Sequence, residues 1–453
     1  MDRQKQLETE KVQKLLIKFS IPAITGMLVN AFYNIIDRAY IGHIKGVGSL
    51  AITGVGLTLP IMTIIMAFGM LIGLGAAAII SIKLGQHKKE DAEKILGNAF
   101  ILLCIIMILI TIIGLMFINP ILRSFGSSEV TFNFAKEYIT IILLGSITNA
   151  LGFGLNNCIR AEGNPKMAMV TMLLGAILNL ILDPIFIFTL NMGIKGAAIA
   201  TVISQTANTI WVLRYFTGSR SSLKLKKENF KLEKKIFLEI ISIGMAPFAV
   251  QLAASVVTVI SNNALKATGG DLAIGAMTIV NSVSLVFLMP IFGINQGAQP
   301  IIGYNYGAKQ YKRVKETLII AICSATVIVT LGFCIIRIFP TYIIRIFNGD
   351  AEMIKVGTNG LKTFLCMLPI IGFQIVSSNY FQAIGKAKIA VVLSLLRQVI
   401  ILIPMLLILP KIFGLNGVWM SAPVADLVSS IVTAVFLLRE MKKLDKAHNA
   451  REK

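Results

Sequence analysis

Charged residues are scarce in this chain, and acidic residues are the scarcest of them. Asp, Glu, Lys and Arg make up 14% of the 453 residues, where soluble domains carry about 25%. Only three histidines and five cysteines are present, and the cysteines lack metal-ligand spacing. This composition excludes a disulfide-stapled domain, and we expect no metal site and no cofactor.

Long apolar runs take the place of the missing charge, since hydrophobic residues make up 56% of the chain. Runs long enough to cross a bilayer recur along the whole length. We expect twelve membrane-spanning helices and no large soluble domain. The expected spans are 15–40, 50–80, 95–118, 131–157, 166–190, 196–216, 236–263, 273–303, 314–338, 353–381, 388–409 and 413–438.

The chain also contains an internal repeat. Residues 75–96 match residues 297–318 at an offset of 222 positions, and the same offset relates Asn157–Ala168 to Asn379–Ala390. Six spans in each half is an even number, so both halves enter the membrane in the same orientation. We therefore predict an all-α integral membrane fold of two six-helix bundles, related by a parallel repeat with a pseudo-two-fold axis along the membrane normal.

The repeat also predicts the domain boundaries. We expect an N-terminal bundle at 1–216, a basic connection at 217–235, and a C-terminal bundle with its tail at 236–453. One chain then supplies both halves of an alternating-access transporter. For this reason a monomer is the expected working unit.

The net charge of +21 is unevenly distributed. Lys and Arg gather in the terminal segments and the even-numbered connections, most densely at 224–235. This is the positive-inside asymmetry, and it predicts that both termini are cytoplasmic. We expect the basic segments to lie at anionic lipid and not to bind nucleic acid.

Acidic residues enter the interior of the predicted spans at three positions only: Asp37, Asp183 and Asp426. A carboxylate in the bilayer core costs several kcal/mol, so such residues are functional candidates by default. For Asp426 the simpler interpretation is an ion pair with Arg397, a basic residue inside a predicted span of the second half. A role in transport is the alternative.

Polar residues accompany the first two carboxylates at helical spacing. Asn34 precedes Asp37 on one helix face, Asn179 lies four residues before Asp183, and the next predicted span carries Thr201 and Gln205. These faces could close on one polar cavity that holds a coupling ion. The ion could be a proton exchanged by the carboxylates, or Na⁺ held by hard oxygen ligands. Alternatively, the amides and hydroxyls only join helices by hydrogen bonds.

The chain resembles the MATE (multidrug and toxic compound extrusion) family, and is most similar to its MepA- and DinF-like bacterial members. The resemblance covers essentially the full chain, and no single motif is as specific as a metal signature. The segments that carry it are IPAITGMLVNAFYNIIDRAYIG at 21–42, GLGAAAIISIKLGQ at 73–86, RAEGNPKMAM at 160–169, LNLILDPIFIF at 178–188 and GIKGAAIATVISQ at 193–205.

The resemblance implies a multidrug efflux antiporter in a bacterial cell membrane. It would export cationic or amphipathic drugs in exchange for protons or sodium. The family roles in ion coupling fall on the four residues Asp37, Asn179, Asp183 and Thr201. Tyr138 and Asn156 are similar to further polar positions of the family network. Pro22 matches the proline at which the first helix is thought to bend, although a static kink is the commoner meaning of such a residue.

The sequence departs from one branch of the family, which places carboxylates on the seventh and tenth spans. The polar residues in the interior of these two spans are Gln, Ser, Thr and Asn, without a carboxylate, so we expect the coupling chemistry in the first half. A flippase for a lipid-linked oligosaccharide or another amphipathic lipid remains the alternative function. We expect no enzyme activity, because the three histidines fall outside the spans and no Asp-rich motif occurs.

Overall fold

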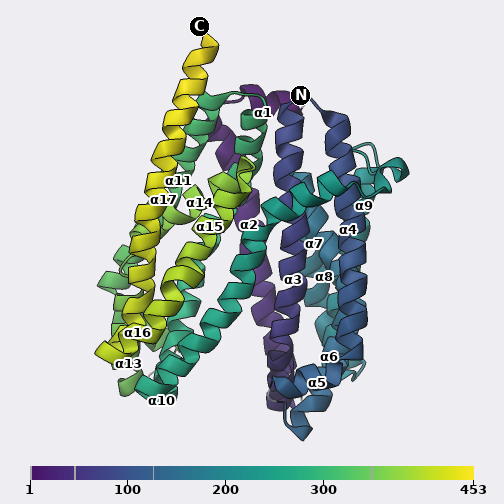
Figure 1. Ribbon diagram of the computed structural model, residues 1–453. Coiled ribbons are helices and arrows are strands. Elements are labelled where there is room, and N and C mark those ends of the chain that lie inside the picture. Colours follow the sequence, from purple (N-terminus) through teal and green to yellow (C-terminus); the bar gives the residue numbers. More distant parts are fainter. Residues whose placement is uncertain (1–2, 45–46, 126, 348–349, 453) are drawn as a thin grey trace. The chain divides into compact units, whose positions relative to one another are not determined.

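The structure, a computed structural model, describes residues 3–44, 47–125, 127–347 and 350–452. Within these ranges the chain has no strand, and the expected all-α fold is confirmed (Figure 1). The helical elements are α1 Arg3–Thr9, α2 Val12–Gly42, α3 Gly48–Gly85, α4 Lys89–Met116, α5 Ile118–Ser124, α6 Glu129–Leu144, α7 Ser146–Ala161, α8 Pro165–Pro184, η1 Ile185–Thr189, α9 Gly193–Thr217, η2 Lys227–Phe230, α10 Lys234–Gly307, α11 Tyr311–Ile338, α12 Pro340–Phe347, α13 Ala351–Phe364, α14 Leu368–Ala383, α15 Ala387–Leu395, η3 Leu396–Leu402, α16 Ile403–Phe413 and α17 Leu415–Glu452.

The expected spans correspond to ten apolar helical stretches and two bent helix pairs among the described residues. Two of these stretches, Lys234–Gly270 and Leu272–Gly307, belong to α10, which is kinked at Gly270. Helices dominate because hydrocarbon offers no partner to backbone N–H and C=O groups, so each segment must satisfy its own. The fourth and tenth spans were expected as single helices. Each is instead bent, by 54° between α6 and α7 and by 48° between α13 and α14.

The repeat extends to the backbone conformation. Both bent pairs lie at the same offset of 222 residues, since Glu129–Ala161 corresponds to Ala351–Ala383. Left-handed residues recur in the same register: His87 and Lys309 both have φ 59°, and Gly163 and Gly385 have φ 94° and 76°. The two halves therefore share turn geometry as well as sequence motifs.

The chain forms two compact units, and each unit contains the beginning of a helix whose remainder belongs to the other unit. Unit 1 holds Thr25–Gly244 together with the N-terminal residues up to Gln6, whereas unit 2 holds Leu7–Ile24 and the chain from Met245 on. The expected division at 1–216 and 236–453 thus differs from the observed one. The beginning of α2 packs in unit 2, and the connection at 217–235 and the beginning of α10 pack in unit 1.

Glycines at matching repeat positions allow this exchange. Within unit 1, a Cβ on Gly75 of α3 would overlap the carbonyl oxygen of Ile240 on α10. Within unit 2, a Cβ on Gly297 would lie 2.8 Å from the backbone N of Ser20 on α2. The glycine shared by the two copies of the repeat is therefore a backbone-to-backbone crossing point. Only a residue without a side chain fits there.

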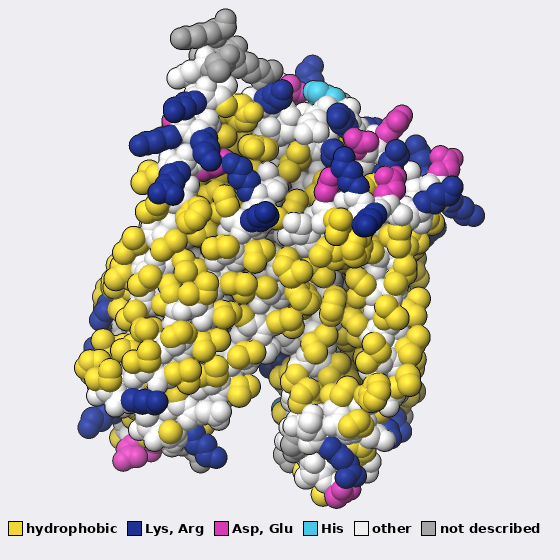
Figure 2. All heavy atoms as spheres, viewed as in Figure 1, with side chains coloured by type: hydrophobic (Ala, Val, Ile, Leu, Met, Phe, Trp, Pro, Cys, Tyr) yellow, Lys and Arg dark blue, Asp and Glu magenta, His cyan; other side chains and the backbone are white. Residues whose placement is uncertain are grey.

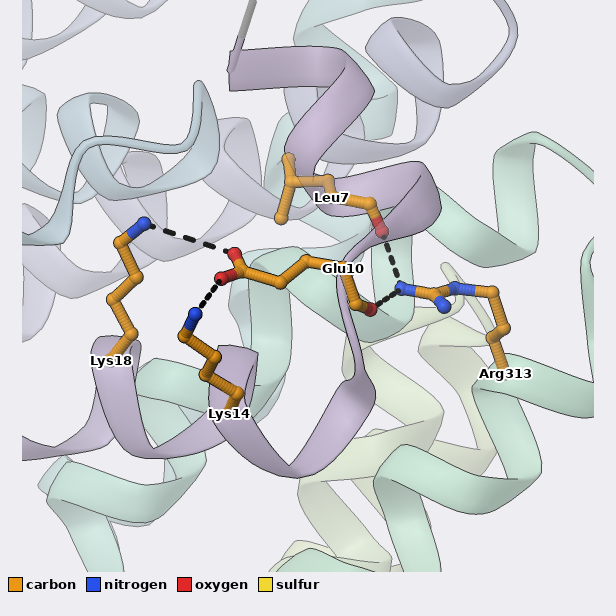
Figure 3. A network of polar contacts seen from close by, with 5 residues as sticks. All are labelled: Leu7, Glu10, Lys14, Lys18 and Arg313. Carbon is orange, nitrogen blue, oxygen red and sulfur yellow. Dashed lines mark hydrogen bonds and ion pairs between the residues drawn. The ribbon is translucent and has the colours of Figure 1, made fainter. Parts of the chain in front are cut away.

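Side-chain hydrogen bonds fix the start of the exchanged segment within unit 2 (Figure 3). Arg313 on α11 donates from Nη2 to the carbonyl oxygens of Leu7 and Glu10, at 3.1 and 2.7 Å. Asn305 also donates to Leu7 O, at 3.2 Å, and its own side-chain oxygen accepts from Arg313 Nε at 3.0 Å. Lys14 and Lys18 flank the Glu10 carboxylate at 3.5 and 3.8 Å.

Replacing Arg313 with Gln is expected to release residues 7–11 from unit 2. Two charge-assisted bonds to backbone carbonyls are lost, a change of about 2–3 kcal/mol in local stability. Trypsin cleavage after Lys11 and Lys14, followed by mass spectrometry on the folded protein, should then accelerate severalfold. Arg345→Gln, at an exposed site on α12, is the matched control. Equal cleavage rates in both variants would contradict the anchoring role.

Two buried carboxylates hold the basic connection against unit 1. Glu162 Oε2 accepts hydrogen bonds from Ser221 Oγ at 2.7 Å and from Leu223 N at 3.2 Å. Glu93 on α4 accepts from Lys224 N at 3.1 Å and pairs with Lys226 Nζ at 2.7 Å, a hydrogen bond that raises the pKa of Lys226. The connection is thus part of unit 1 and not a free linker.

The surface of each unit has the polarity of a membrane protein. Figure 2 shows hydrophobic side chains over the middle of each unit and Lys and Arg gathered at the ends. Large apolar side chains such as Leu331 and Ile400 are more than half exposed. The protein is a multi-pass membrane protein.

Candidate functional site

Two carboxyl groups meet inside unit 1. Asp37 lies on the part of α2 that belongs to this unit, and Asp183 lies on the last turn of α8. Their side chains are 9% and 1% exposed, and the two carboxyl groups interact as hydrogen-bonding neighbours. Two neighbouring carboxylates repel each other unless a proton or a cation lies between them.

An amide and a hydroxyl complete the group around Asp183. Asn179, one turn earlier on α8, donates from Nδ2 to Asp183 Oδ1 at 3.1 Å and to Thr201 Oγ1 on α9 at 3.4 Å. Asn179 and Thr201 are buried. The i, i+4 spacing of Asn179 and Asp183 places both on the face of α8 that packs against α9. The structure therefore brings together all four residues proposed for ion coupling.

Two tyrosines face the same carboxyl pair. Tyr138 on α6 is 2% exposed and interacts electrostatically with both Asp37 and Asp183. Tyr33, one turn before Asp37 on α2, has the same two neighbours. Tyr138 was expected here, whereas Tyr33 was missed. Its i, i+4 spacing from Asp37 is the signal that could have found it.

The other expected network members lie elsewhere or cannot be placed. Asn156 on α7 donates to Ala168 O at 3.2 Å, fifteen residues and about 22 Å before Asp183 along α8. Gln205 lies one turn beyond Thr201 on α9, and its buried Oε1 has no hydrogen-bond partner among the described residues. The side chain of Asn34 lies outside the described residues.

Pro22 is distant from the carboxyl pair along α2. It is buried in unit 2, three residues before the helix passes into unit 1 at Thr25. The helix continues through it from Val12 to Gly42. A bend at Pro22 would therefore act at the point where α2 changes units.

The chemistry of the site is that of oxygen ligands. Three buried oxygen atoms, Asp37 Oδ1, Asp183 Oδ2 and Asn179 Oδ1, have no hydrogen-bond partner among the described residues. Unpartnered buried acceptors are suited to a proton or a hard cation. Among the described residues, no group of three His, Cys, Asp or Glu side chains could hold a transition metal.

The corresponding region of unit 2 has a different charge arrangement. Asp426 on α17 is 2% exposed and accepts from Arg397 Nε on η3 at 2.5 Å. The expected Asp426–Arg397 ion pair is confirmed. At the repeat positions of Asn179 and Asp183, unit 2 has Ile401 and Met405. The carboxyl pair is thus confined to unit 1.

A family model matches the chain twice, over residues 22–185 and 236–408, and it is the model of the MatE family. The two matches cover most of the chain and coincide with its two halves. The chain belongs to the MatE family. The expected MATE family membership is therefore confirmed.

Curated relatives and solved structures give the same result. The multidrug export protein MepA of Staphylococcus haemolyticus is 29% identical over 97% of both chains. MepA of Staphylococcus aureus (strain MSSA476) is 30% identical over 97% of this chain and 96% of its own length. The MATE multidrug transporter DinF-BH, solved in complex with rhodamine 6G, is 41% identical with a TM-score of 0.88, and the match covers 95% of this chain and 96% of that chain.

Proposed function

We propose that this MATE protein is a multidrug efflux antiporter that exports cationic or amphipathic drugs. The named relatives are multidrug export proteins, and one of them is known with rhodamine 6G bound. Export against a gradient needs an energy source, and the carboxyl pair of unit 1 is an intramembrane site at which an ion can bind. The observation that carries the proposal is the contact between Asp37 and Asp183.

A proton is the coupling ion that this geometry favours. Two carboxyl groups that interact as hydrogen-bonding neighbours can share one proton, and loss of this proton leaves two repelling charges. The repulsion between α2 and α8 would then favour a different helix arrangement until a proton or a cationic drug neutralises it. Alternating access follows if protonated and drug-loaded states open to opposite sides.

Sodium coupling is the second candidate. It is supported by the three unpartnered buried oxygens at the same site, to which Thr201 Oγ1 adds a fourth oxygen nearby. Na⁺ prefers such neutral and anionic oxygen ligands, in the manner of other hard cations.

Counter-transport in liposomes should separate these mechanisms. The purified protein is reconstituted, a fluorescent cation such as rhodamine 6G is loaded inside, and either a pH gradient or a Na⁺ gradient is imposed. Proton antiport predicts efflux driven by the pH gradient at zero Na⁺, and sodium antiport predicts the reverse. Dissipation of each gradient by an ionophore is the control. If neither gradient drives efflux, antiport is wrong for this protein.

The orientation follows from the charge distribution. We propose that both termini are cytoplasmic, because Lys and Arg concentrate in the terminal segments and in the connection at 217–235. We also propose that the protein lies in a bacterial cell membrane and acts as a monomer. Cysteine accessibility at an introduced site near residue 448 in intact and in permeabilised cells tests the orientation.

A further inference from the structure

Unit 2 contains a buried polar stripe that the proposed antiport mechanism does not use. On α17, Asp426, Ser430, Thr433 and Glu440 follow one face of the helix, at spacings of four, three and seven residues. Their exposed fractions are 2%, 5%, 0% and 4%. Burying four polar residues along one face of a membrane helix costs free energy unless hydrogen-bond partners offset it, so such residues are functional candidates.

Among the described residues, partners are present only at the two ends of the stripe. Asp426 is paired with Arg397, and Glu440 accepts two bonds from Lys386 Nζ at 2.5 and 2.6 Å. Between them, the hydroxyls of Ser430 and Thr433 are buried and have no hydrogen-bond partner in the described chain. The interior of the stripe is therefore polar and unsatisfied, whereas its ends are ion-paired.

Helix α14 runs alongside and adds two more unpaired hydroxyls. Cys366, just before α14, is an electrostatic neighbour of Asp426, and Tyr380, near the end of α14, is a neighbour of Glu440. Cys366 and Tyr380 are fourteen residues apart, as are Asp426 and Glu440, which corresponds to about 21 Å along a helix. The two helices therefore run parallel over that length. Ser377 Oγ and Tyr380 OH are buried without a hydrogen-bond partner among the described residues.

The repeat provides an internal comparison, at a local offset of 221 residues. The positions of unit 1 that correspond to Asp426, Thr433 and Glu440 are Gln205, Val212 and Ser219. Val212 is apolar, and Ser219 is exposed beyond the end of α9. Thr209, which corresponds to Ser430, already donates to Thr148 O at 2.5 Å. The continuous buried polar line is thus specific to the second half, and the duplicated scaffold does not require it.

We propose that Ser430, Thr433, Ser377 and Tyr380 form a proton path through unit 2 between Glu440 and Asp426. Buried hydroxyls without protein partners are sites for ordered water, and alternating hydroxyls and water molecules conduct protons by successive transfer. A proton that enters at Glu440 moves along this line and adds to the Asp426 carboxylate, and one proton enters from bulk water for each one bound. The neutral carboxylic acid then no longer forms an ion pair with the Arg397 guanidinium.

Charged and titratable groups frame both ends of the path. Asp426 is faced by Arg397 from η3 and by Cys366, which also has Arg337 of α11 as a neighbour. Glu440 is faced by Lys386, Tyr380 and Tyr306. Arg397 lies on one of the two π-helical stretches of the described chain, and the other begins two residues after Asp183. π-Helical stretches are rare in proteins, and those that occur are often found at functional sites.

The test follows the protonation of Asp426 after a pH jump by time-resolved infrared spectroscopy of the carboxylic C=O band. The full-length protein carries Asp37→Asn and Asp183→Asn, so that the carboxyl group observed in the membrane is that of unit 2. Asp426→Asn identifies its band. In this background, Ser430→Ala with Thr433→Val should retain the band but slow its appearance about tenfold or more, because a positioned relay group is lost.

Two controls separate the path from packing. Thr433→Ser with Ser430→Ala returns one hydroxyl and should restore most of the rate. Ser421→Ala removes another buried hydroxyl of α17, one that donates to Gly417 O of its own helix, and should leave the rate unchanged. Thermal unfolding verifies that each variant is folded. An unchanged rate in the Ser430→Ala, Thr433→Val variant, or no Asp426 band in the folded protein, would overturn the proposal.

The outcome is independent of the proposed antiport, because the background lacks the unit 1 carboxyl pair. If the path exists and drug counter-transport fails, only the function proposed above is wrong. If counter-transport succeeds but Asp426 never takes up a proton, only the path is wrong.

Discussion

Replacement of Asp183 with Asn is expected to abolish ion-driven drug export while the protein remains folded. The substitution keeps the size of the side chain and its acceptor for Asn179 Nδ2, but it removes the charge and the exchangeable proton. Without these, the contact with Asp37 no longer changes between repulsive and neutral states. Gradient-driven efflux of rhodamine 6G from liposomes should fall about a hundredfold or more, the scale of losing an essential proton-transfer group.

Asp37→Asn should have the same effect, and the double variant should be no worse than either single one, because the two carboxyl groups act as a unit. Asp91→Asn is the matched control in the same unit, since that side chain is 43% exposed and pairs with Lys83 at 3.7 Å. Its efflux should equal that of the wild type. Normal gradient-driven efflux by Asp183→Asn would remove the carboxyl pair from the mechanism.

Replacement of Gly75 with Val is expected to prevent the normal packing of unit 1. A Cβ at this position overlaps the carbonyl oxygen of Ile240 and lies 3.1 Å from Gly244 N, and backbone atoms cannot move aside as a flexible side chain can. We expect a loss of more than about 3 kcal/mol in the free energy of unfolding, at the upper end of overpacking effects. The measurement is the yield of monodisperse protein and its thermal unfolding midpoint.

Gly56→Val is the control on the same helix, because a Cβ there meets no atom within 4 Å. It should leave yield and midpoint nearly unchanged. Gly297→Val should resemble Gly75→Val, since Gly297 is its repeat counterpart and packs against Ser20. Wild-type stability of both Gly75→Val and Gly297→Val would show that the helix crossings tolerate separation.

Much of the site could be predicted because the membrane makes polar residues conspicuous. Asp37 and Asp183 stood out as carboxylates in apolar spans, and Asn179 was found by its spacing from Asp183. Tyr33 was missed because a tyrosine at a span interior is ordinary. Asn156 was grouped with the site by resemblance, but its amide bonds to Ala168 O instead. Helical spacing shows which residues share a face, and it does not show the depth at which two helices meet.

The sequence by itself determined the architecture: the apolar runs require spanning helices, and the offset of 222 residues requires two related halves. Only the tertiary structure decided that α2 and α10 each divide between the two units. An apolar helix satisfies its own backbone wherever it packs, so its sequence does not specify its partner. The choice is made by close contacts such as those of Gly75 with Ile240 and Gly297 with Ser20, which exist only once the chain is folded.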